Sequence, residues 1–333
     1  MTVHRALGTC LLAFVLLGAG TVAAAGDAWE ASGHGILVHE YAPGGQAITL
    51  KTCTHLAFEN GYEIISDLGN SRFLYRRDPG EEWKVSSVPV KMQHSLLFNP
   101  ADGLYYADDT GNQRMVAFRD LSDASLAAIS NEMAGVTLDR PHDVVRDPAT
   151  GWLYMINPNE PVVVRFRALG VDEKALSLDA ELNYSRGLTF AKGRLYVVGS
   201  SVGKVIEITD FDQGKYRVYT GHGKKAEGPA GNWPRTGLVP NDVAWFEGWW
   251  YLTSFFTPST PYSEPGDDVD TNKFIRFRDW DAFESGDWED CSDLVPSGAT
   301  PYYLTVDQGA LYLAIFSDGD GPNAILRLRP DTK

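Results

Sequence analysis

The chain has 333 residues, with 29 lysines and arginines against 44 aspartates and glutamates, and a formal net charge of −15 at pH 7. Polyanions repel a protein this acidic, which excludes nucleic acid and an anionic membrane surface as partners. Apolar residues make up 44% of the chain, which is enough to build an ordinary folded core.

Residues 1–25 have the pattern of a secretory signal. His4 and Arg5 form a weakly basic start, 11–17 is apolar, and three alanines at 23–25 provide a small-residue cleavage site. The apolar core is too short to span a membrane, and no later stretch is long enough. We therefore expect a secreted or periplasmic protein whose remaining part, 26–333, forms one domain.

Residues 141–167 read as three short strands separated by turns at 147–151 and 157–159. The same unit occurs six times, and its copies begin at His55, His94, His142, Arg186, Asn241 and Tyr302. These starts lie between 39 and 61 residues apart, and a repeat of this length made of short strands is typical of propeller blades. The sequence therefore predicts an all-β fold, a six-bladed β-propeller.

The last copy supplies only three strands before the chain ends, whereas 35–41 predicts a strand before the first copy. We expect this N-terminal strand to close the ring as the fourth strand of blade 6, which removes a sheet edge. Outside the signal, two cysteines remain. Cys53 is expected on an inner strand and Cys291 on an outer strand of another blade, and this separation favours free thiols over a disulfide.

In a propeller blade, the innermost strand begins on the face of the molecule where the second strand ends. The six copy starts therefore form a polar ring at one mouth of the central channel. The second strands contribute Asp67, Asp108 and Asn157 to the same mouth. We interpret these three as substrate-binding residues, together with His222 from the segment that leads into blade 5.

Three histidines, His55, His94 and His142, occupy what the repeat suggests is one equivalent position. Three converging imidazoles are a plausible site for Zn, Cu or Fe with an open position for water or substrate. Such a metal would polarise a carbonyl group or generate hydroxide at neutral pH. The simpler alternative is that the channel holds water and the histidines bond one another.

Further candidate catalytic groups lie on the same ring. Arg186 could bind a carboxylate or stabilise an oxyanion. Tyr302 or Tyr303 could act as a general acid or base, and Asp143, next to His142, is a further catalytic candidate.

A second ligand set competes with the histidines. Asn241 and Asp242 are oxygen donors of the kind that Ca²⁺ prefers, and Asp67, Asp108 and Asn157 are expected nearby. The ordinary alternative is that Asn and Asp after a proline belong to a turn. The predicted cofactor is therefore a divalent metal, a transition metal in the histidine ring or Ca²⁺ at the oxygen donors.

Two stretches of the sequence resemble known propeller families. The blade openings 92–96 (MQHSL) and 140–144 (RPHDV) resemble those of peptidyl-hydroxyglycine amidating lyase, a six-bladed propeller of the NHL type. That resemblance implies zinc bound by His94 and His142, less clearly by His55, with Arg186 and Tyr302 assisting a lyase reaction. The stretch 240–243 (PNDV) resembles the paraoxonase, gluconolactonase and strictosidine-synthase-like propellers, which implies Ca²⁺ at this blade start.

The sequence thus predicts an exported, monomeric, metal-dependent enzyme, a hydrolase, lyase or isomerase, acting on a small carbonyl- or carboxylate-bearing substrate. The alternative is a propeller without catalysis that holds a structural Ca²⁺. In that case the loops 221–239 and 257–271 would grip a ligand or a protein.

Overall fold

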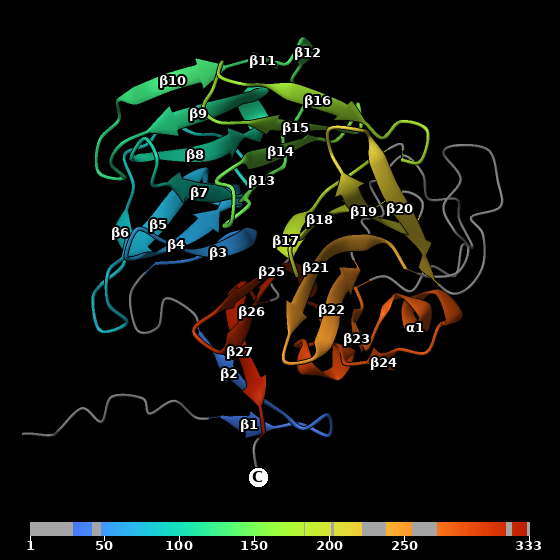
Figure 1. The fold of residues 1–333 in the computed structure, drawn as a ribbon. Helices are drawn as coiled ribbons and strands as arrows, with labels where there is room; N and C mark the ends of the chain where they lie inside the picture. The colour runs from blue at the N-terminus through green and yellow to red at the C-terminus, as the bar shows by residue number, and fades with distance from the viewer. Residues whose placement is uncertain are drawn as a thin grey trace, which may run out of the picture.

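The computed structural model describes residues 29–41, 48–182, 184–200, 203–221, 238–254, 272–317 and 322–331. The predicted signal, His222 and the loop 257–271 lie outside the described residues. Six antiparallel sheets are arranged around a central axis (Figure 1), which confirms the predicted all-β six-bladed propeller. No helix among the described residues is long and apolar enough to cross a membrane.

The first three blades are four-stranded and run outward in chain order. Blade 1 has β3 (Cys53–Glu59), β4 (Tyr62–Asp67), β5 (Arg72–Arg76) and β6 (Lys84–Val85). Blade 2 has β7 (Leu96–Asn99), β8 (Leu104–Asp109), β9 (Arg114–Phe118) and β10 (Leu126–Ser130). Blade 3 has β13 (Asp143–Arg146), β14 (Leu153–Asn157), β15 (Val162–Phe166) and β16 (Lys174–Ser177). The small hairpin of β11 (Glu132–Met133) and β12 (Val136–Thr137) leads from blade 2 to blade 3.

Blades 4 and 5 repeat the plan. Blade 4 has β17 (Leu188–Ala191), β18 (Arg194–Gly199), β19 (Lys204–Asp210) and β20 (Lys215–Thr220). Blade 5 has β21 (Pro240–Phe246), β22 (Trp249–Ser254), β23 (Phe274–Phe277) and β24 (Glu289–Asp290), with the short helix α1 (Trp280–Ser285) between its last two strands. Among the described residues, three short 3₁₀ helices lie in loops between strands: η1 (Leu68–Asn70), η2 (Thr110–Asn112) and η4 (Ser292–Leu294).

The sixth blade joins the two ends of the described chain. Its inner strands are β25 (Thr300–Asp307), β26 (Ala310–Phe316) and β27 (Ala324–Pro330). The N-terminal strand β2 (Ile36–Glu40) pairs antiparallel with β27, and β1 (Glu30–Ala31) pairs with β2. Blade 6 therefore contains strands from both ends of the chain, held together by backbone hydrogen bonds (Figure 1).

The core lies between neighbouring blades rather than at one centre. Alternate strand residues point to opposite faces of each sheet, so each blade packs one apolar face on the blade before it and one on the blade after it. Tyr106 of blade 2 meets Phe166 of blade 3 with ring centroids 5.8 Å apart, and Tyr196 of blade 4 meets Trp250 of blade 5 at 4.8 Å. Burying these large side chains on both faces makes each blade depend on its two neighbours.

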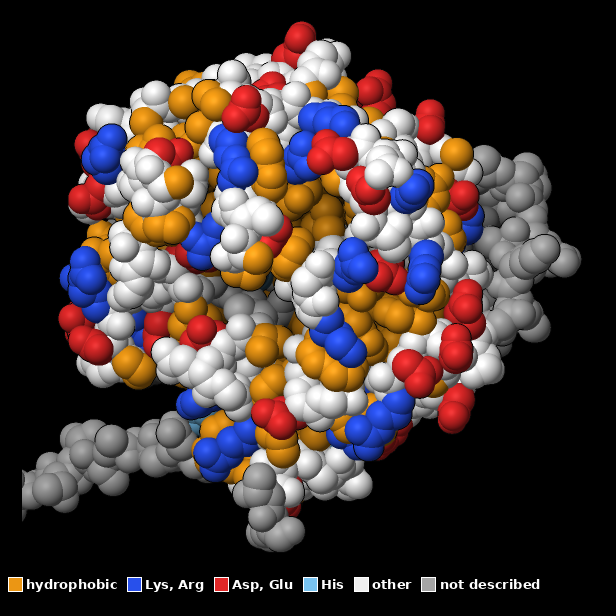
Figure 2. Space-filling model, in the orientation of Figure 1, with side chains coloured by type: hydrophobic (Ala, Val, Ile, Leu, Met, Phe, Trp, Pro, Cys, Tyr) orange, Lys and Arg blue, Asp and Glu red, His pale blue; other side chains and the backbone are white. Residues whose placement is uncertain are grey.

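Both cysteines outside the predicted signal are buried free thiols, which confirms the expectation from their strands. Cys53 packs in the cluster between blades 6 and 1, and Cys291 in the cluster between blades 5 and 6. On the face turned toward the viewer, Figure 2 shows acidic and basic side chains interspersed over the blades, without a broad area of one sign.

Candidate active site at the channel mouth

Strand pairing shows which residues are equivalent from blade to blade. Near the start of each inner strand, a buried aliphatic residue pairs with the middle of the second strand, as in Leu56 with Ile65 and Val144 with Met155. Two positions before that aliphatic residue, the six blades carry Thr54, His94, His142, Arg186, Asn241 and Tyr302. We call these six residues the mouth ring. The predicted equivalence of His55 with His94 and His142 is therefore wrong by one residue.

In blades 1 to 3, the turn before the inner strand gives the same register. Thr52, Met92 and Arg140, each two residues before the mouth ring, share a left-handed backbone with φ of 51°, 52° and 59°. In blade 1 the ladder shifts between Cys53 and His55, so Thr54 is bulged. A shift of one residue sends a side chain to the other face of a strand. His55 therefore occupies the position of Asp143.

At the ends of the second strands, the predicted equivalence of Asp108 with Asp67 is also wrong by one residue. The backbone N–H of Lys51 donates to Asp67, and that of Lys91 donates to Asp109, each at 2.7 Å. The residue equivalent to Asp67 is therefore Asp109, not Asp108 as the sequence suggested. The successive aspartates of β8 made both choices compatible with the sequence pattern.

Two imidazoles lie in close contact at the mouth ring, with their planes tilted. The rings of His94 and His142 have centroids 3.7 Å apart and an interplanar angle of 33°. His94 Nδ1 lies 3.1 Å from Thr110 Oγ1 and 3.8 Å from Asp108 Oδ1, and His142 Nε2 lies 3.4 Å from the hydroxyl of Tyr302. Both histidines are almost fully buried, so the pair is held by packing as well as by hydrogen bonds.

The surroundings hold these groups neutral. Burial lowers the pKa of His94 and His142 well below the usual value, and the positive charges of Arg186 and Arg140 lower it further. Burial also raises the pKa of Tyr302. At neutral pH the mouth ring therefore presents two uncharged imidazoles and an uncharged phenol beside two guanidinium groups.

Several buried polar atoms at the ring have no hydrogen-bond partner within the part of the chain that the structure describes. They are His142 Nδ1, Ser185 Oγ and both side-chain atoms of Asn241. Buried polar groups in folded proteins are nearly always paired, so a cluster without partners marks a place where a ligand or water completes the bonding. Asn241 has no exposed surface, which makes its two unpaired atoms costly unless something binds there.

Three further candidates have structural partners instead. Asp143 accepts from the backbone N–H of Val144 and, across the blade boundary, of Leu188, each at 2.8 Å, while burial raises its pKa to about 6. Asp242 accepts from the N–H of Leu304 in blade 6 at 2.7 Å. The hydroxyl of Tyr303 donates across the channel to the backbone carbonyls of His142 at 3.2 Å and Arg186 at 2.9 Å. These side chains connect blades.

The predicted substrate-binding side chains are also occupied within the protein. Asp67 accepts from the side chains of Asn70 and Arg72. Asp108 accepts from the N–H groups of His94 and Ser95, and Asn157 accepts from the N–H of Asp139. His55 is half-buried, and its imidazole lies edge-on to Tyr303 with ring centroids 5.9 Å apart. Burial lowers the pKa of His55 to about 4.

These contacts decide how well the predicted metals fit the mouth ring. The three histidines do not gather their nitrogens, since the one described cluster of three His, Cys, Asp or Glu ligand atoms within 4.8 Å lies elsewhere. Of the five oxygen-bearing side chains proposed for Ca²⁺, only Asn241 has unpaired atoms, whereas Ca²⁺ takes six to eight oxygens. Among the described residues the three histidines therefore do not form one ligand cluster, and both the transition metal and Ca²⁺ stay predictions of the sequence.

The sequence reasoning missed four residues that shape the site. Arg140 and Tyr184 lie two residues before ring members of blades 3 and 4, Tyr184 with its ring centroid 6.3 Å from that of His142. Thr110 holds His94, and Ser185 contributes an unpaired hydroxyl. The available signal for Arg140 and Tyr184 was their place in the sequence, two residues before the copy starts His142 and Arg186.

The chain matches no protein-family model and no curated protein. Among solved structures, it is similar to a gluconolactonase from Xanthomonas campestris, with 15% identity, a TM-score of 0.59 and coverage of 88% of this chain and 89% of that one. It is similar to virginiamycin B lyase from Staphylococcus aureus crystallised with quinupristin, with 12% identity, a TM-score of 0.56 and coverage of 90% and 93%. These likenesses show the fold alone.

A structure of a nidogen/laminin complex also matches, with 15% identity, a TM-score of 0.52 and coverage of 85% of this chain and 87% of that one. The structures that share the fold thus include a hydrolase, a lyase and a member of a protein complex, and the fold does not choose among them.

Proposed function

We propose that this protein is an exported propeller enzyme, a lyase or hydrolase, that acts on a small carbonyl- or carboxylate-bearing substrate at the mouth ring. The observation that carries the proposal is the buried, neutral pair of His94 and His142, with an unpaired Nδ1 on His142 and Tyr302 at its Nε2. The gluconolactonase and the lyase among the similar structures support it at the level of fold.

Elimination and hydrolysis both need a group that takes a proton and a group that returns one. When the single imidazole proton of His142 lies on Nε2, it is donated to the hydroxyl of Tyr302 and leaves Nδ1 as a proton acceptor. Because the pKa of Tyr302 is raised, its phenol keeps its proton and can supply it to a leaving group. His142 is then the proposed base and Tyr302 the proposed acid.

The two guanidinium groups explain how substrate would activate this base. Arg186 and Arg140 disfavour a protonated His142 in the free protein. A carboxylate or a developing oxyanion bound by Arg186 would offset that positive charge and raise the basicity of His142 when substrate is present. The amide of Asn241, unpaired and fully buried, would orient a polar group of the same substrate.

A transition metal at His94 and His142 stays a prediction of the sequence, as do export, the monomeric state and the small-molecule substrate. When bound, such an ion would polarise a substrate carbonyl. Elemental analysis of the purified protein beside a His94→Asn/His142→Asn variant checks for it. The proposed acid–base chemistry requires only the chain's own residues.

The proposed function is tested with a panel of small lactones, hydroxy acids and carboxylated amides, with products followed by mass spectrometry. For a substrate that the wild type converts, Arg186→Gln should lower kcat/KM about 10- to 100-fold, since a charged hydrogen bond is lost. His142→Asn should lower kcat about 10²- to 10⁴-fold through loss of the base. Arg194→Gln, on the same blade with a half-exposed side chain 3.6 Å from Glu207, is the matched control and should keep full activity.

Conversion that survives both ring substitutions would refute the assignment of the site. A wild type that converts no member of the panel, yet binds a ligand or protein without turnover, would favour the non-catalytic propeller instead.

A further inference from the structure

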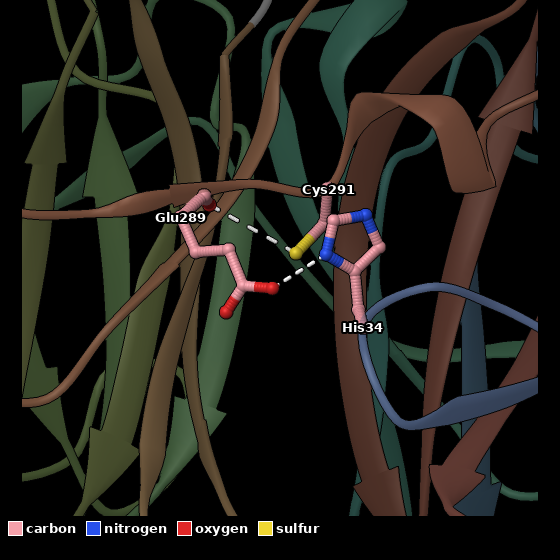
Figure 3. Close-up of side chains that lie close together, drawn as sticks. All are labelled: His34, Glu289 and Cys291. Atoms are coloured by element: carbon pink, nitrogen blue, oxygen red, sulfur yellow. Dashed lines mark hydrogen bonds and ion pairs between the residues drawn. The ribbon is translucent and has the colours of Figure 1, made fainter.

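A second group of reactive side chains lies outside the channel, at the contact between the N-terminal segment and blade 5. His34 sits in the turn between β1 and β2. Glu289 belongs to β24, and Cys291 follows it, next to η4. Figure 3 shows the imidazole of His34 and the sulfur of Cys291 side by side, with the Glu289 carboxylate facing the imidazole.

The three side chains place different donor atoms close together. His34 Nδ1 lies 2.5 Å from Glu289 Oε1, and one ligand atom from each of the three side chains, the sulfur of Cys291 included, lies within 4.8 Å of the other two. Cys291 is fully buried, His34 is mostly buried, and the Glu289 side chain is 36% exposed. The group is therefore closed on the protein side and open to solvent on the side of the carboxylate.

Two neighbours fix the orientation of the donors. Asp293 Oδ1 lies 2.6 Å from His34 Nε2 and can accept its proton, which leaves Nδ1 to bind an ion. The guanidinium of Arg276 donates to Glu289 Oε2 at 2.8 Å and to the backbone carbonyl of His34 at 2.9 Å, which leaves Oε1 directed at the group. A carboxylate behind a ligating histidine is the usual partner in zinc sites.

We propose that His34 Nδ1, Glu289 Oε1 and Cys291 Sγ bind a divalent transition ion, Zn²⁺ by ligand type, with water in the fourth position. Imidazole, carboxylate and thiolate together suit Zn²⁺, whereas Ca²⁺ and Mg²⁺ prefer oxygen ligands alone. This site is separate from the mouth ring and does not rest on the proposed function.

Binding requires a small movement of one side chain and the loss of one proton. Donor atoms around a tetrahedral zinc lie roughly 3.3 to 3.8 Å apart when the bonds are about 2.0 to 2.3 Å long. Glu289 Oε1 must therefore move about an ångström away from His34 Nδ1, and its partly exposed side chain has room to do so. The Cys291 thiol must lose its proton to the solvent, as thiols do when they bind zinc.

An ion there would fasten two distant parts of the chain. His34 and Glu289 are 255 residues apart in sequence, and the turn that carries His34 leads directly into β2, the strand that completes blade 6. The ion would thus hold the N-terminal strand to the rim of blade 5, beside the place where the pairing of β2 with β27 closes the ring. Metal binding should therefore raise the midpoint of thermal unfolding, because only the folded state brings the ligands together.

A simpler arrangement without metal is an imidazolium between two carboxylates. Burial opposes the charge on His34, but the hydrogen bonds that its ring donates to the carboxylates of Glu289 and Asp293 outweigh burial and raise the pKa of His34. The two arrangements differ in the role of the thiol, because an ion pair makes no use of Cys291.

Cobalt(II) distinguishes the two, because a cobalt–thiolate bond gives a charge-transfer absorption in the near ultraviolet. The full chain, treated with a chelator and then dialysed, is titrated with Co²⁺ alone. One equivalent should produce the band, and Zn²⁺ should displace it. His34→Ala and Cys291→Ser should each weaken Co²⁺ binding at least tenfold and abolish the band, while Cys53→Ser, which alters the other buried thiol, should leave both unchanged.

His34→Ala lies in a surface turn, so it keeps the test valid if Cys291→Ser fails to fold. A His94→Asn/His142→Asn variant should retain the band, which separates this site from the channel. Absence of the band in the folded wild type, or its persistence in folded His34→Ala, would overturn the proposal and leave an ion pair.

Discussion

Replacing Asp242 with alanine is expected to lower the free energy of unfolding by about 3 to 5 kcal/mol. The carboxylate is almost completely buried and accepts from the N–H of Val243 at 2.8 Å, the N–H of Leu304 at 2.7 Å and the hydroxyl of Thr189 at 3.1 Å. These donors belong to blades 5, 6 and 4. Alanine leaves two buried backbone N–H groups without an acceptor, and each such group costs about 1 to 3 kcal/mol.

Urea unfolding followed by circular dichroism measures this loss. Asp212→Ala is the matched control, since Asp212 pairs with Arg165 and Lys174 at the surface, and its loss should leave the free energy of unfolding almost unchanged. The destabilisation by Asp242→Ala should be the same in Ca²⁺ and in a chelator. A loss that appears only in Ca²⁺ would return Asp242 to the role of a calcium ligand.

The fold was predictable because it repeats. Short strands, turns and a spacing near 40 to 60 residues recur six times, and periodicity of that kind survives large differences in individual residues. The two histidines in close contact were also predictable, since their blades open with the same local pattern at 92–96 and 140–144. Local sequence was sufficient wherever one blade resembled the next.

The sequence did not predict the role of a side chain where that role depends on a one-residue shift in strand register or on a contact with a distant segment. A bulge at Thr54 turns His55 toward Tyr303, and hydrophobic alternation does not specify a bulge. The structural roles of Asp143 and Asp242 arise from N–H groups on neighbouring blades. The group of His34 and Glu289 joins segments 255 residues apart, and neither segment carries a metal-binding motif.

Acid should destabilise the wild type relative to a His94→Asn/His142→Asn variant. Both histidines have a pKa in the folded protein well below the ordinary 6.5, because burial and the charges of Arg186 and Arg140 disfavour their protonation. The unfolded chain takes up these protons as the pH falls below about 6.5, and the folded chain does not. Each histidine should then cost up to about 1.4 kcal/mol per pH unit once the unfolded imidazole is fully protonated, so the pair should cost roughly 3 kcal/mol between pH 6.5 and 5.

The comparison must be made between the two proteins, because carboxyl groups titrate in both. The Asp143 carboxyl, with its pKa raised to about 6, is protonated in the folded state before the unfolded one, and this opposes acid destabilisation between about pH 6 and 4. Subtracting the variant's urea-unfolding profile removes such contributions where they are shared, whereas Asp108, which faces His94, loses that neighbour in the variant. Parallel pH profiles would mean that the folded protein protonates the pair as readily as the unfolded chain. His142 would then be charged at mildly acidic pH and could not serve there as the proposed base.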